Sequence, residues 1–301
     1  MSNQIKIAGF GVTTLDYIAL VEELDSNKNA KISMFETVLG GLTGNAILAA
    51  KRLGAKTSLK SFFGNDEAGE KILHLLSTEN IDTIFCEKIS GKKSLFSFIT
   101  IDFNTGERTI FSHKDNIDVL QEAIDFSFLD NADACLLDIH WKEAGLAVAK
   151  EANKRNIPII ADFRINKENT HILNDIDYPI ISIDYALSLS DDGKIETALH
   201  KMKDSGAGNP IITAGKNGCY YIDEISKKSI NIPAFKINPV DTCGAGDVFH
   251  GAFAFAITQF TLKEALLFAS ASSAIKCTRF GGGKGSPSFE EVMLFLKKYN
   301  L

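Results

Sequence analysis

Apolar residues follow two different spacings along this chain. Strand-length segments that are mostly apolar occupy residues 5–9, 132–139, 157–161 and 210–214. Other segments repeat apolar side chains every three to four positions, which is the spacing of a helix with one buried face. These segments are residues 45–53, 142–155 and 246–260. Because strands and helices alternate from about residue 130 onward, the pattern predicts an α/β fold whose mostly parallel sheet carries helices on both faces.

Capping residues mark where several helices begin. Asp66 precedes an apolar helical repeat and is the predicted N-cap of that helix. Thr261 with Glu264, and Ser288 with Glu291, have the spacing of capping boxes, in which two side chains satisfy each other's backbone amides. The last third of the chain is therefore predicted to end in two further helices.

Four segments do not follow the helical pattern. Residues 16–21, 31–38, 94–100 and 108–113 have the composition of strands, and turn-forming residues at 102–106 separate the last two. They predict a small antiparallel sheet inserted into the α/β body as a lid, with lid segments at about residues 12–38 and 92–114. Since no linker-like composition interrupts the chain, residues 1–301 are expected to form a single domain.

Composition limits the binding partners and the cellular compartment that can be expected for this protein. The 301 residues carry a net charge of −6, which suits neither nucleic acid nor an anionic membrane. No apolar run approaches the ~20 residues of a membrane span, and residues 1–10 lack the apolar core of a signal peptide. The five cysteines are widely spaced and lie in apolar surroundings, so they are expected to be small buried hydrophobes in a reducing compartment. These features predict a cytoplasmic protein.

The stretch from Asp241 to Phe253 carries the clearest chemistry. Gly244, Ala245 and Gly246 allow a tight turn that leads directly into an apolar helix. The unpaired amides and the dipole at such a helix start bind a phosphoryl group or another anion. Asp247 lies in the same turn, where a carboxylate can accept the proton of an attacking hydroxyl. The alternative is that Asp247 only caps the helix and the small residues only permit close packing.

Two common phosphate-binding motifs are excluded at this place. A dinucleotide fingerprint needs a glycine where the chain has Phe249. A Walker A loop needs Ser or Thr after Gly-Lys, but Gly283-Lys284 is followed by Gly285.

The chain resembles the ribokinase, or PfkB, family of carbohydrate kinases. Residues 241–253 match the C-terminal signature of that family at every constrained position. The N-terminal signature is matched by Gly40, Gly41, Asn45, Gly54 and Gly64, followed by a GxDxxG-like run at 64–69 and a TxGxxG-like turn at 213–218. The chain departs from the signature at Thr43 and Ile47. The resemblance implies a ribokinase-like three-layer α/β/α fold, with a central mostly parallel sheet and a β-sheet lid over the sugar.

The resemblance also implies roles for individual residues. Asp247 is the expected general base, and the amides of residues 244–246 are the expected anion hole. ATP with Mg²⁺ is the expected donor, with its base between the 213–218 turn and residues 270–283. The implied nucleotide-binding residues are Thr213, Gly215, Gly218 and Gly281. The NxxE motif that many members use for Mg²⁺ is missing from residues 182–185.

A monovalent cation, K⁺, is a further cofactor that the resemblance implies. In some family members such an ion lies near the residue that corresponds to Asp241. Carbonyl oxygens of the 281–286 loop are its other expected ligands in this chain.

The sugar is expected to bind between the lid and the adjoining residues of the α/β body. Asp16 stands where the family grips sugar hydroxyls, and a carboxylate suits that task because it only accepts hydrogen bonds. Asn45 is expected either to contact the sugar or to cap the helix of residues 45–53. The full set of predicted substrate contacts is Asp16, Gly40, Gly41, Asn45, Phe98, Arg108 and His140. Phe98 is expected to cover the sugar or to pack within the lid, and Arg108 to meet an anionic substituent or solvent.

The loop sequences most resemble those of the branch that contains fructokinases, ketohexokinases and sulfofructose kinases. The expected activity is ATP-dependent phosphorylation of a primary hydroxyl on a small sugar, a ketohexose or a derivative such as sulfofructose. A nucleoside kinase of the same fold is one alternative, and it needs an aromatic pair around the base. A catalytically weak sugar-binding regulator is the other. Exposed lid strands favour a homodimer formed through the lid.

Overall fold

The computed structural model describes residues 4–22, 29–104, 108–113, 117, 119–162, 164 and 170–301. Its central sheet has eight strands in the order β14-β13-β12-β11-β10-β9-β1-β4. The strands are β1 (Lys6–Phe10), β4 (Lys56–Lys60), β9 (Ala134–Asp138), β10 (Ile159–Asp162), β11 (Tyr178–Ser182), β12 (Ile211–Thr213), β13 (Cys219–Ile222) and β14 (Ser229–Ile232). The neighbours from β4 to β12 pair in parallel, and β13 and β14 form an antiparallel edge.

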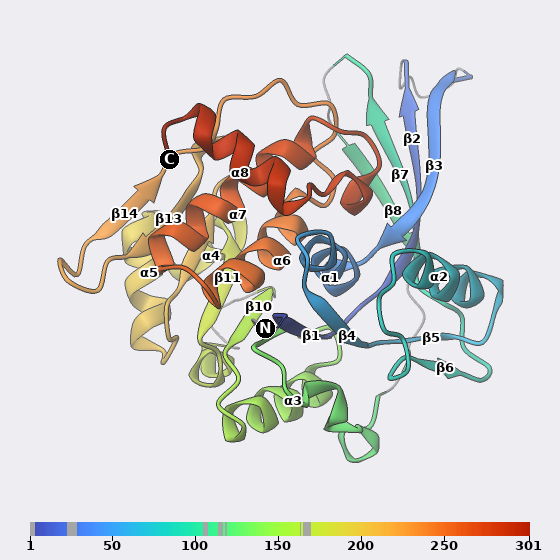
Figure 1. Cartoon of the computed structure of the whole chain (residues 1–301), viewed down its shortest axis with the longest axis horizontal. Coiled ribbons are helices and arrows are strands. Elements are labelled where there is room, and N and C mark those ends of the chain that lie inside the picture. The colour runs from blue at the N-terminus through green and yellow to red at the C-terminus, as the bar shows by residue number, and fades with distance from the viewer. Residues whose placement is uncertain are drawn as a thin grey trace.

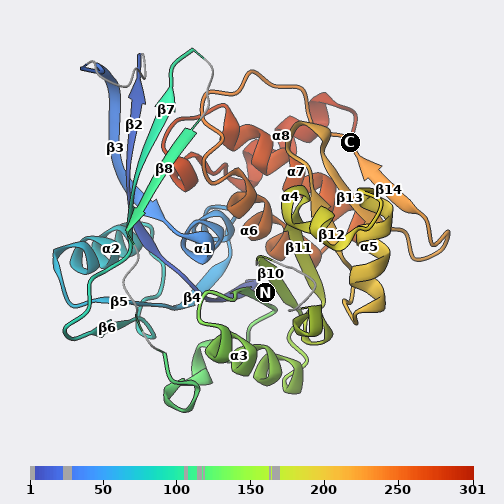
Figure 2. The same ribbon diagram turned by 180° about the vertical axis from the view of Figure 1, so that it is seen from behind.

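Helices cover both faces of this sheet (Figures 1 and 2). They are α1 (Leu42–Arg52), α2 (Glu67–Thr78), α3 (Lys142–Lys154), α4 (Ile183–Ala186), α5 (Ile195–Asp204), α6 (Ala245–Ile257), α7 (Leu262–Cys277) and α8 (Phe289–Lys298). Successive side chains of a strand point to opposite faces. On β9, accordingly, Leu136 packs in one hydrophobic cluster with α1 and α6, while Cys135 and Leu137 pack in the other with α3 and α5. The predicted arrangement of parallel sheet and flanking helices is confirmed.

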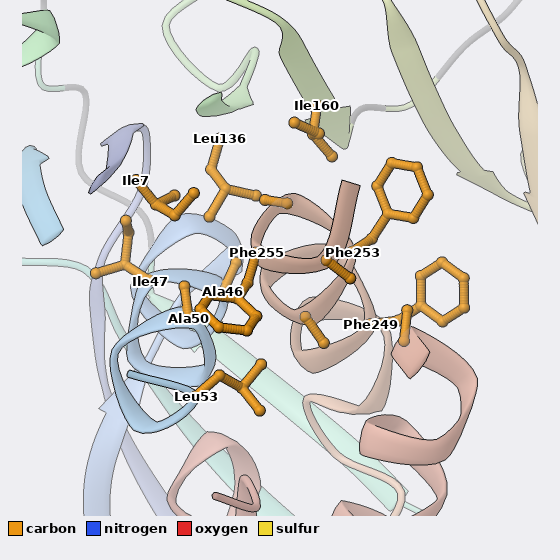
Figure 3. Packing of buried hydrophobic residues seen from close by; sticks show 14 of the residues in the cluster. Ile7, Ala46, Ile47, Ala50, Leu53, Leu136, Ile160, Phe249, Phe253 and Phe255 are labelled. Carbon is orange, nitrogen blue, oxygen red and sulfur yellow. The ribbon is translucent and has the colours of Figure 1, made fainter. Parts of the chain in front are cut away.

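Helices α1 and α6 lie side by side on one face of the sheet (Figure 3). Phe255 of α6 and Ala46 and Ala50 of α1 lie between them, whereas Phe253 points away from α1 and packs on Tyr178 of β11. The two helices approach so closely that a methyl group on Gly251 would collide with the Ala46 carbonyl. Their first turns are therefore held next to each other at the edge of the sheet.

A second sheet projects from the body as a lid (Figures 1 and 2). Its order is β3-β2-β7-β8, and its strands are β2 (Thr14–Val21), β3 (Ile32–Gly40), β7 (Phe96–Asp102) and β8 (Arg108–His113). All four predicted lid strands are present, but the sheet is mixed, because β2 and β7 pair in parallel. The purely antiparallel prediction is wrong because the chain returns through the body between β3 and β7. It then enters the lid again in the direction of β2.

The capping predictions agree with the structure. The Asp66 side chain accepts a hydrogen bond from the Gly69 amide at 2.9 Å, and both capping boxes are formed. The first helix differs from its prediction: it begins at Leu42, and Gly41 is its N-cap. Asn45 therefore lies inside α1, so the alternative that it caps this helix is wrong.

The remaining elements are short. A two-stranded sheet pairs β5 (Phe62–Gly64) with β6 (Glu87–Ile89). The 3-10 turns are η1 (Gln121–Ala123), η2 (Phe126–Leu129), η3 (Thr170–Asp175), η4 (Leu187–Leu189), η5 (Gly215–Asn217) and η6 (Gly282–Gly285). Within the described residues, no helix combines the length and the apolar character needed to cross a bilayer.

Candidate active site

A cleft of about 770 Å³ lies between the carboxyl ends of the parallel strands, the start of α6 and the lid. Such a crevice outside the strand ends is where open α/β sheets bind ligands. Residues far apart in the sequence meet here. Those that the sequence predicted and that line the cleft are Asp16, Gly41, Asn45, Arg108, His140, Gly244, Ala245, Gly246 and Asp247.

The turn before α6 has the shape that the sequence predicted. Gly244 is the N-cap with φ of 73°, a left-handed conformation that favours glycine. The Ala245 amide closes the turn by donating to the Thr242 carbonyl at 3.3 Å. The Gly246 and Asp247 amides follow in the first helical turn, where N–H groups have no intrahelical acceptor. The positive end of the α6 dipole therefore faces the cleft beside the Asp247 carboxylate.

Asp247 is held by one specific partner. The Asn45 amide donates to its Oδ2 at 2.7 Å, which is possible because α1 and α6 pack so closely. Burial raises the pKa of Asp247 to about 7, and the nearby Asp162 carboxylate adds to the rise. A carboxylate with a pKa near neutrality is well matched to accept a proton at physiological pH.

His250 lies one turn further along α6, below Asp247. Its Nδ1 is 2.7 Å from the Gly246 carbonyl oxygen and its Nε2 is 2.9 Å from that of Ile180. Nε2 is also 3.8 Å from Asp162 Oδ2. Both ring nitrogens therefore face carbonyl oxygens, which anchor the imidazole between α6 and β11. The sequence offered no signal for this position beyond the residue type.

Asp16 lies at the lid end of the cleft. Its side chain is buried and accepts a hydrogen bond from the Thr14 hydroxyl at 2.7 Å. Burial raises the pKa of Asp16 to about 6. A side chain at Gly40 would collide with this carboxylate, and one at Gly41 with the Val12 backbone. The two glycines thus make room for Asp16 and for the turn into α1.

A buried carboxylate that the sequence analysis missed holds two residues that line the cleft, Val12 and His140. Asp138, at the end of β9, accepts hydrogen bonds from the Val12 amide at 2.6 Å, the Thr43 hydroxyl at 2.8 Å and the His140 amide at 3.0 Å. Thr43, which departs from the family signature, is therefore used to fix Asp138. The only signal was an acidic residue at the end of an apolar strand.

Comparison with known proteins identifies the family. The profile of the pfkB family carbohydrate kinases matches residues 4–288. The chain belongs to the pfkB family of carbohydrate kinases. Proteins of this family transfer a phosphoryl group to a hydroxyl acceptor, so the prediction of a phosphotransferase is confirmed.

Relatives of this kinase include ribokinases and fructokinases. It is 30% identical to the ribokinase of Bacillus subtilis over 272 residues, which cover 86% of this chain and 87% of that protein. It is 23% identical to fructokinase-2 of Zea mays, with 98% and 95% covered. The ribokinase structure from Thermotoga maritima matches it with a TM-score of 0.80 at 27% identity over 97% and 99% of the two chains. This match confirms the predicted ribokinase-like fold.

The lid of the kinase is tied to the turn before α6 by Arg108. Its guanidinium donates to the Thr242 hydroxyl at 3.0 Å and to the Thr242 carbonyl at 3.3 Å. Other basic side chains surround the same cleft. They are His113, His140, Lys142 and Arg164. The cleft is therefore lined both by carboxylates and by basic side chains.

Phe98 lies on the wrong face of the lid to contact a sugar. In the register of β2 and β7, Asp16 pairs with Ser97. Neighbouring residues of a strand point to opposite faces, so Phe98 points away from the cleft. Its ring stacks on Tyr17, with 4.9 Å between centroids, and is half exposed. The prediction that Phe98 covers the sugar is wrong, whereas Phe96 lines the rim of the cleft.

The predicted nucleotide turn has a shape that requires glycine. Thr213 ends β12, and Gly215 and Gly218 have φ of 52° and 88°. A side chain on Gly218 would also collide with the Ile232 carbonyl. Gly281 has φ of 106°, and its amide donates to Asp241 at 3.1 Å. Binding of a nucleotide by these residues stays a prediction.

Asp241 is paired with a cation of the protein itself. Its Oδ2 is 3.1 Å from the Lys276 ammonium, and both side chains are almost fully buried. This ion pair already supplies Asp241 with a cation, and binding of a monovalent metal ion by Asp241 stays a prediction. In the described part of the chain, no three acidic, histidine or cysteine side chains are grouped as a metal site. Asp184, the residue nearest to the missing NxxE motif, lies exposed at the start of α4.

Proposed function

We propose that this kinase transfers the γ-phosphoryl group of ATP to a primary hydroxyl of a small sugar, a ketohexose or a ketohexose derivative. The observation that carries this proposal is the place of Asp247. It lies beside the first turn of α6 and shares one cleft with Asp16. A hydroxyl held between these two carboxylates would face the helix start at which a phosphoryl group binds.

The residues divide the reaction between them. Asp16 accepts hydrogen bonds from sugar hydroxyls and fixes the ring. Asp247 takes the proton of the attacking hydroxyl while that oxygen forms its bond to the γ-phosphorus and the bond to the leaving ADP breaks. Asn45 holds Oδ2 of Asp247 and thereby fixes the orientation of the carboxylate. The amides at the start of α6 stabilise the charge of the transferring group.

MgATP is the proposed co-substrate. A ribokinase structure from Arabidopsis thaliana contains ribose and ATP, and a structure from Escherichia coli contains ATP and Mg²⁺; both share the fold, with TM-scores of 0.81 and 0.82. Mg²⁺ usually binds through substrate phosphates and few protein carboxylates, which suits a cleft whose described residues form no metal cluster. The turn that contains Thr213, Gly215 and Gly218, together with Gly281, is the proposed border of the adenine site.

The basic side chains that line the cleft indicate which class of sugar it would bind. Arg108, His140 and Arg164 line the cleft together with His113 and Lys142. Cationic groups in such number suit a sugar with an anionic substituent, as in sulfofructose. A nucleoside is less well supported, because Phe98 faces away from the cleft and so supplies no aromatic pair with Phe96.

A substrate screen tests the proposal. ATP consumption is measured with fructose, sulfofructose, ribose, sugar acids and inosine at equal concentration. The proposal expects the highest kcat/KM with a ketohexose or its sulfonate. A preference for inosine would identify a nucleoside kinase. Binding of a sugar without turnover above background would identify a regulator instead.

The outer face of the lid supports a homodimer, which we also propose. Aromatic side chains follow one another across this face: Phe35, Phe98 and Phe111 are 54%, 50% and 60% exposed, and Tyr17 stacks on two of them. Exposed apolar patches of this kind mark contact sites between proteins. Sedimentation should show a dimer for the wild type and a shift toward monomer for Phe98→Ser. An unchanged mass would contradict this interface.

A further inference from the structure

Lys276 is a buried cation close to the turn before α6. It lies in the last turn of α7, and its side chain is 0% exposed. Its ammonium donates to the Asp241 carbonyl at 2.7 Å and is 3.1 Å from Oδ2 of the same residue. Lysine is almost never buried completely unless it is paired, because an ammonium that leaves water is costly. The cost indicates that this cation has a specific role.

The ligands that a monovalent ion would need are already used. Oδ1 of Asp241 accepts the Cys243 amide at 2.7 Å. Most carbonyl oxygens of the 281–286 loop also accept hydrogen bonds from protein donors. Gly281 accepts Lys284 N, Gly283 accepts Ser286 N and Oγ, Lys284 and Ser286 accept Arg52, and Gly285 accepts Arg279. A second cation at Asp241 would also be repelled by the Lys276 ammonium, so the residues of this region do not fit a bound K⁺.

The same ion pair connects the segments that shape the anion hole. Asp241 Oδ2 accepts the amides of Gly281 and Gly282 at 3.1 and 2.9 Å, in addition to its contact with Lys276. Through Cys243 it also fixes the strand of chain that enters the Gly244 turn. The Asp241 carboxylate thus gathers three backbone amides, and the Lys276 ammonium beside it supplies the compensating charge.

We propose that the Lys276 ammonium takes the place of a monovalent metal ion and positions the turn before α6, so that this kinase does not depend on K⁺. The proposal rests on the proposed phosphoryl transfer. Lys276 is a positioning residue here, because it acts on the anion hole through Asp241 and does not reach the cleft itself.

The first measurement uses the wild type. Its kcat with the best sugar is compared in KCl, NaCl and tetramethylammonium chloride at equal ionic strength. The proposal expects the three rates to agree within about 2-fold, since the internal cation is already present. Activation by K⁺ of about 10-fold or more would overturn it. If no sugar is phosphorylated, the proposed function fails, but thermal unfolding still tests the cation: the unfolding temperature should not depend on which salt is used.

The second measurement uses variants at the pair. Lys276→Ala opens space for an ion, whereas Lys276→Met fills it without charge. We expect kcat to fall about 10- to 100-fold in both, with a smaller change in sugar KM, because a displaced anion hole weakens the transition state. Added K⁺ or NH₄⁺ should raise the kcat and the unfolding temperature of Lys276→Ala only. An equal response of both variants to the ions, or an unchanged kcat, would overturn the proposal.

Two control variants distinguish an effect on the position of the anion hole from a general loss of protein stability. The Asp241→Asn, Lys276→Met double variant removes both charges, so it is expected to fold when a single variant does not, and it should still show the reduced kcat without ion rescue. Lys60 is the matched control, because it is 1% exposed and pairs with Glu87 away from the cleft. Lys60→Met should lower stability without an effect of K⁺ on kcat. A normal kcat in the double variant would also contradict the proposal.

Discussion

Replacement of Asp247 by Asn tests two effects of this carboxylate, its destabilisation of the fold and its contribution to kcat. Burial raises the pKa of Asp247 from 3.8 to about 7, so the folded protein resists its ionisation. Between these two pH values the folded state binds a proton that the unfolded state has lost, and stability therefore falls as the pH rises. One pKa unit corresponds to about 1.4 kcal/mol, so the raised pKa of Asp247 destabilises the fold by about 4 kcal/mol at pH 8, where the folded carboxyl is ionised, and by about 2 kcal/mol at pH 5.5, where it is mostly protonated.

Asparagine has no charge to desolvate and keeps an oxygen that Asn45 can bind. With an unfolding entropy of about 0.6 kcal/mol/K for 301 residues, Asp247→Asn should raise the Tm by about 6 °C at pH 8 and about 3 °C at pH 5.5. The same variant should lower kcat by ~10²–10⁴-fold, because the proton acceptor is lost. Thermal unfolding at both pH values and a steady-state assay measure these effects.

The control for this prediction is Asp184→Asn, since the Asp184 carboxylate is exposed to solvent and pays no desolvation penalty. Its Tm should equal that of the wild type at both pH values. An Asp247→Asn protein that is no more stable than the wild type at pH 8 would show that burial does not penalise this carboxylate. A near-normal kcat would show that another group accepts the proton.

Three further predictions address the cleft. In the wild type, kcat/KM should rise with pH and level off above a midpoint of about 7, the pKa of Asp247; a flat profile would contradict its role as base. Asp16→Ala should weaken sugar binding roughly 10- to 100-fold in calorimetry, since a hydrogen bond to a charged group contributes ~1.5–3 kcal/mol; unchanged affinity would remove Asp16 from the site. Gly283→Ala would push a methyl group into Asn45 and should lower kcat about 10-fold, whereas Gly145→Ala, which meets only ordinary contacts, should not.

The local pattern of the chain predicted many of its elements, although β4, β11, β13, β14 and α5 were not among them. Apolar spacing and the capping boxes at Thr261 and Ser288 located strands and helices within a few residues, because these signals act between neighbours in the sequence. The turn from Gly244 to Asp247 was equally clear, since a left-handed residue before an apolar helix requires particular residue types. The fold class and the candidate base, Asp247, could therefore be predicted from the sequence.

Which side chains meet across the molecule was decided only by packing. Asn45 reaches Asp247 because α1 and α6 pack closely, although 202 positions separate the two residues. In the register of β2 and β7, Ser97 lies beside Asp16 on the cleft face, so Phe98 faces outward. A shift of this register by one residue would turn Phe98 toward the cleft. The sequence analysis assigned no role to Lys276, and only the tertiary structure places its ammonium on Asp241. Contacts of this kind depend on distances between elements, which no local pattern encodes.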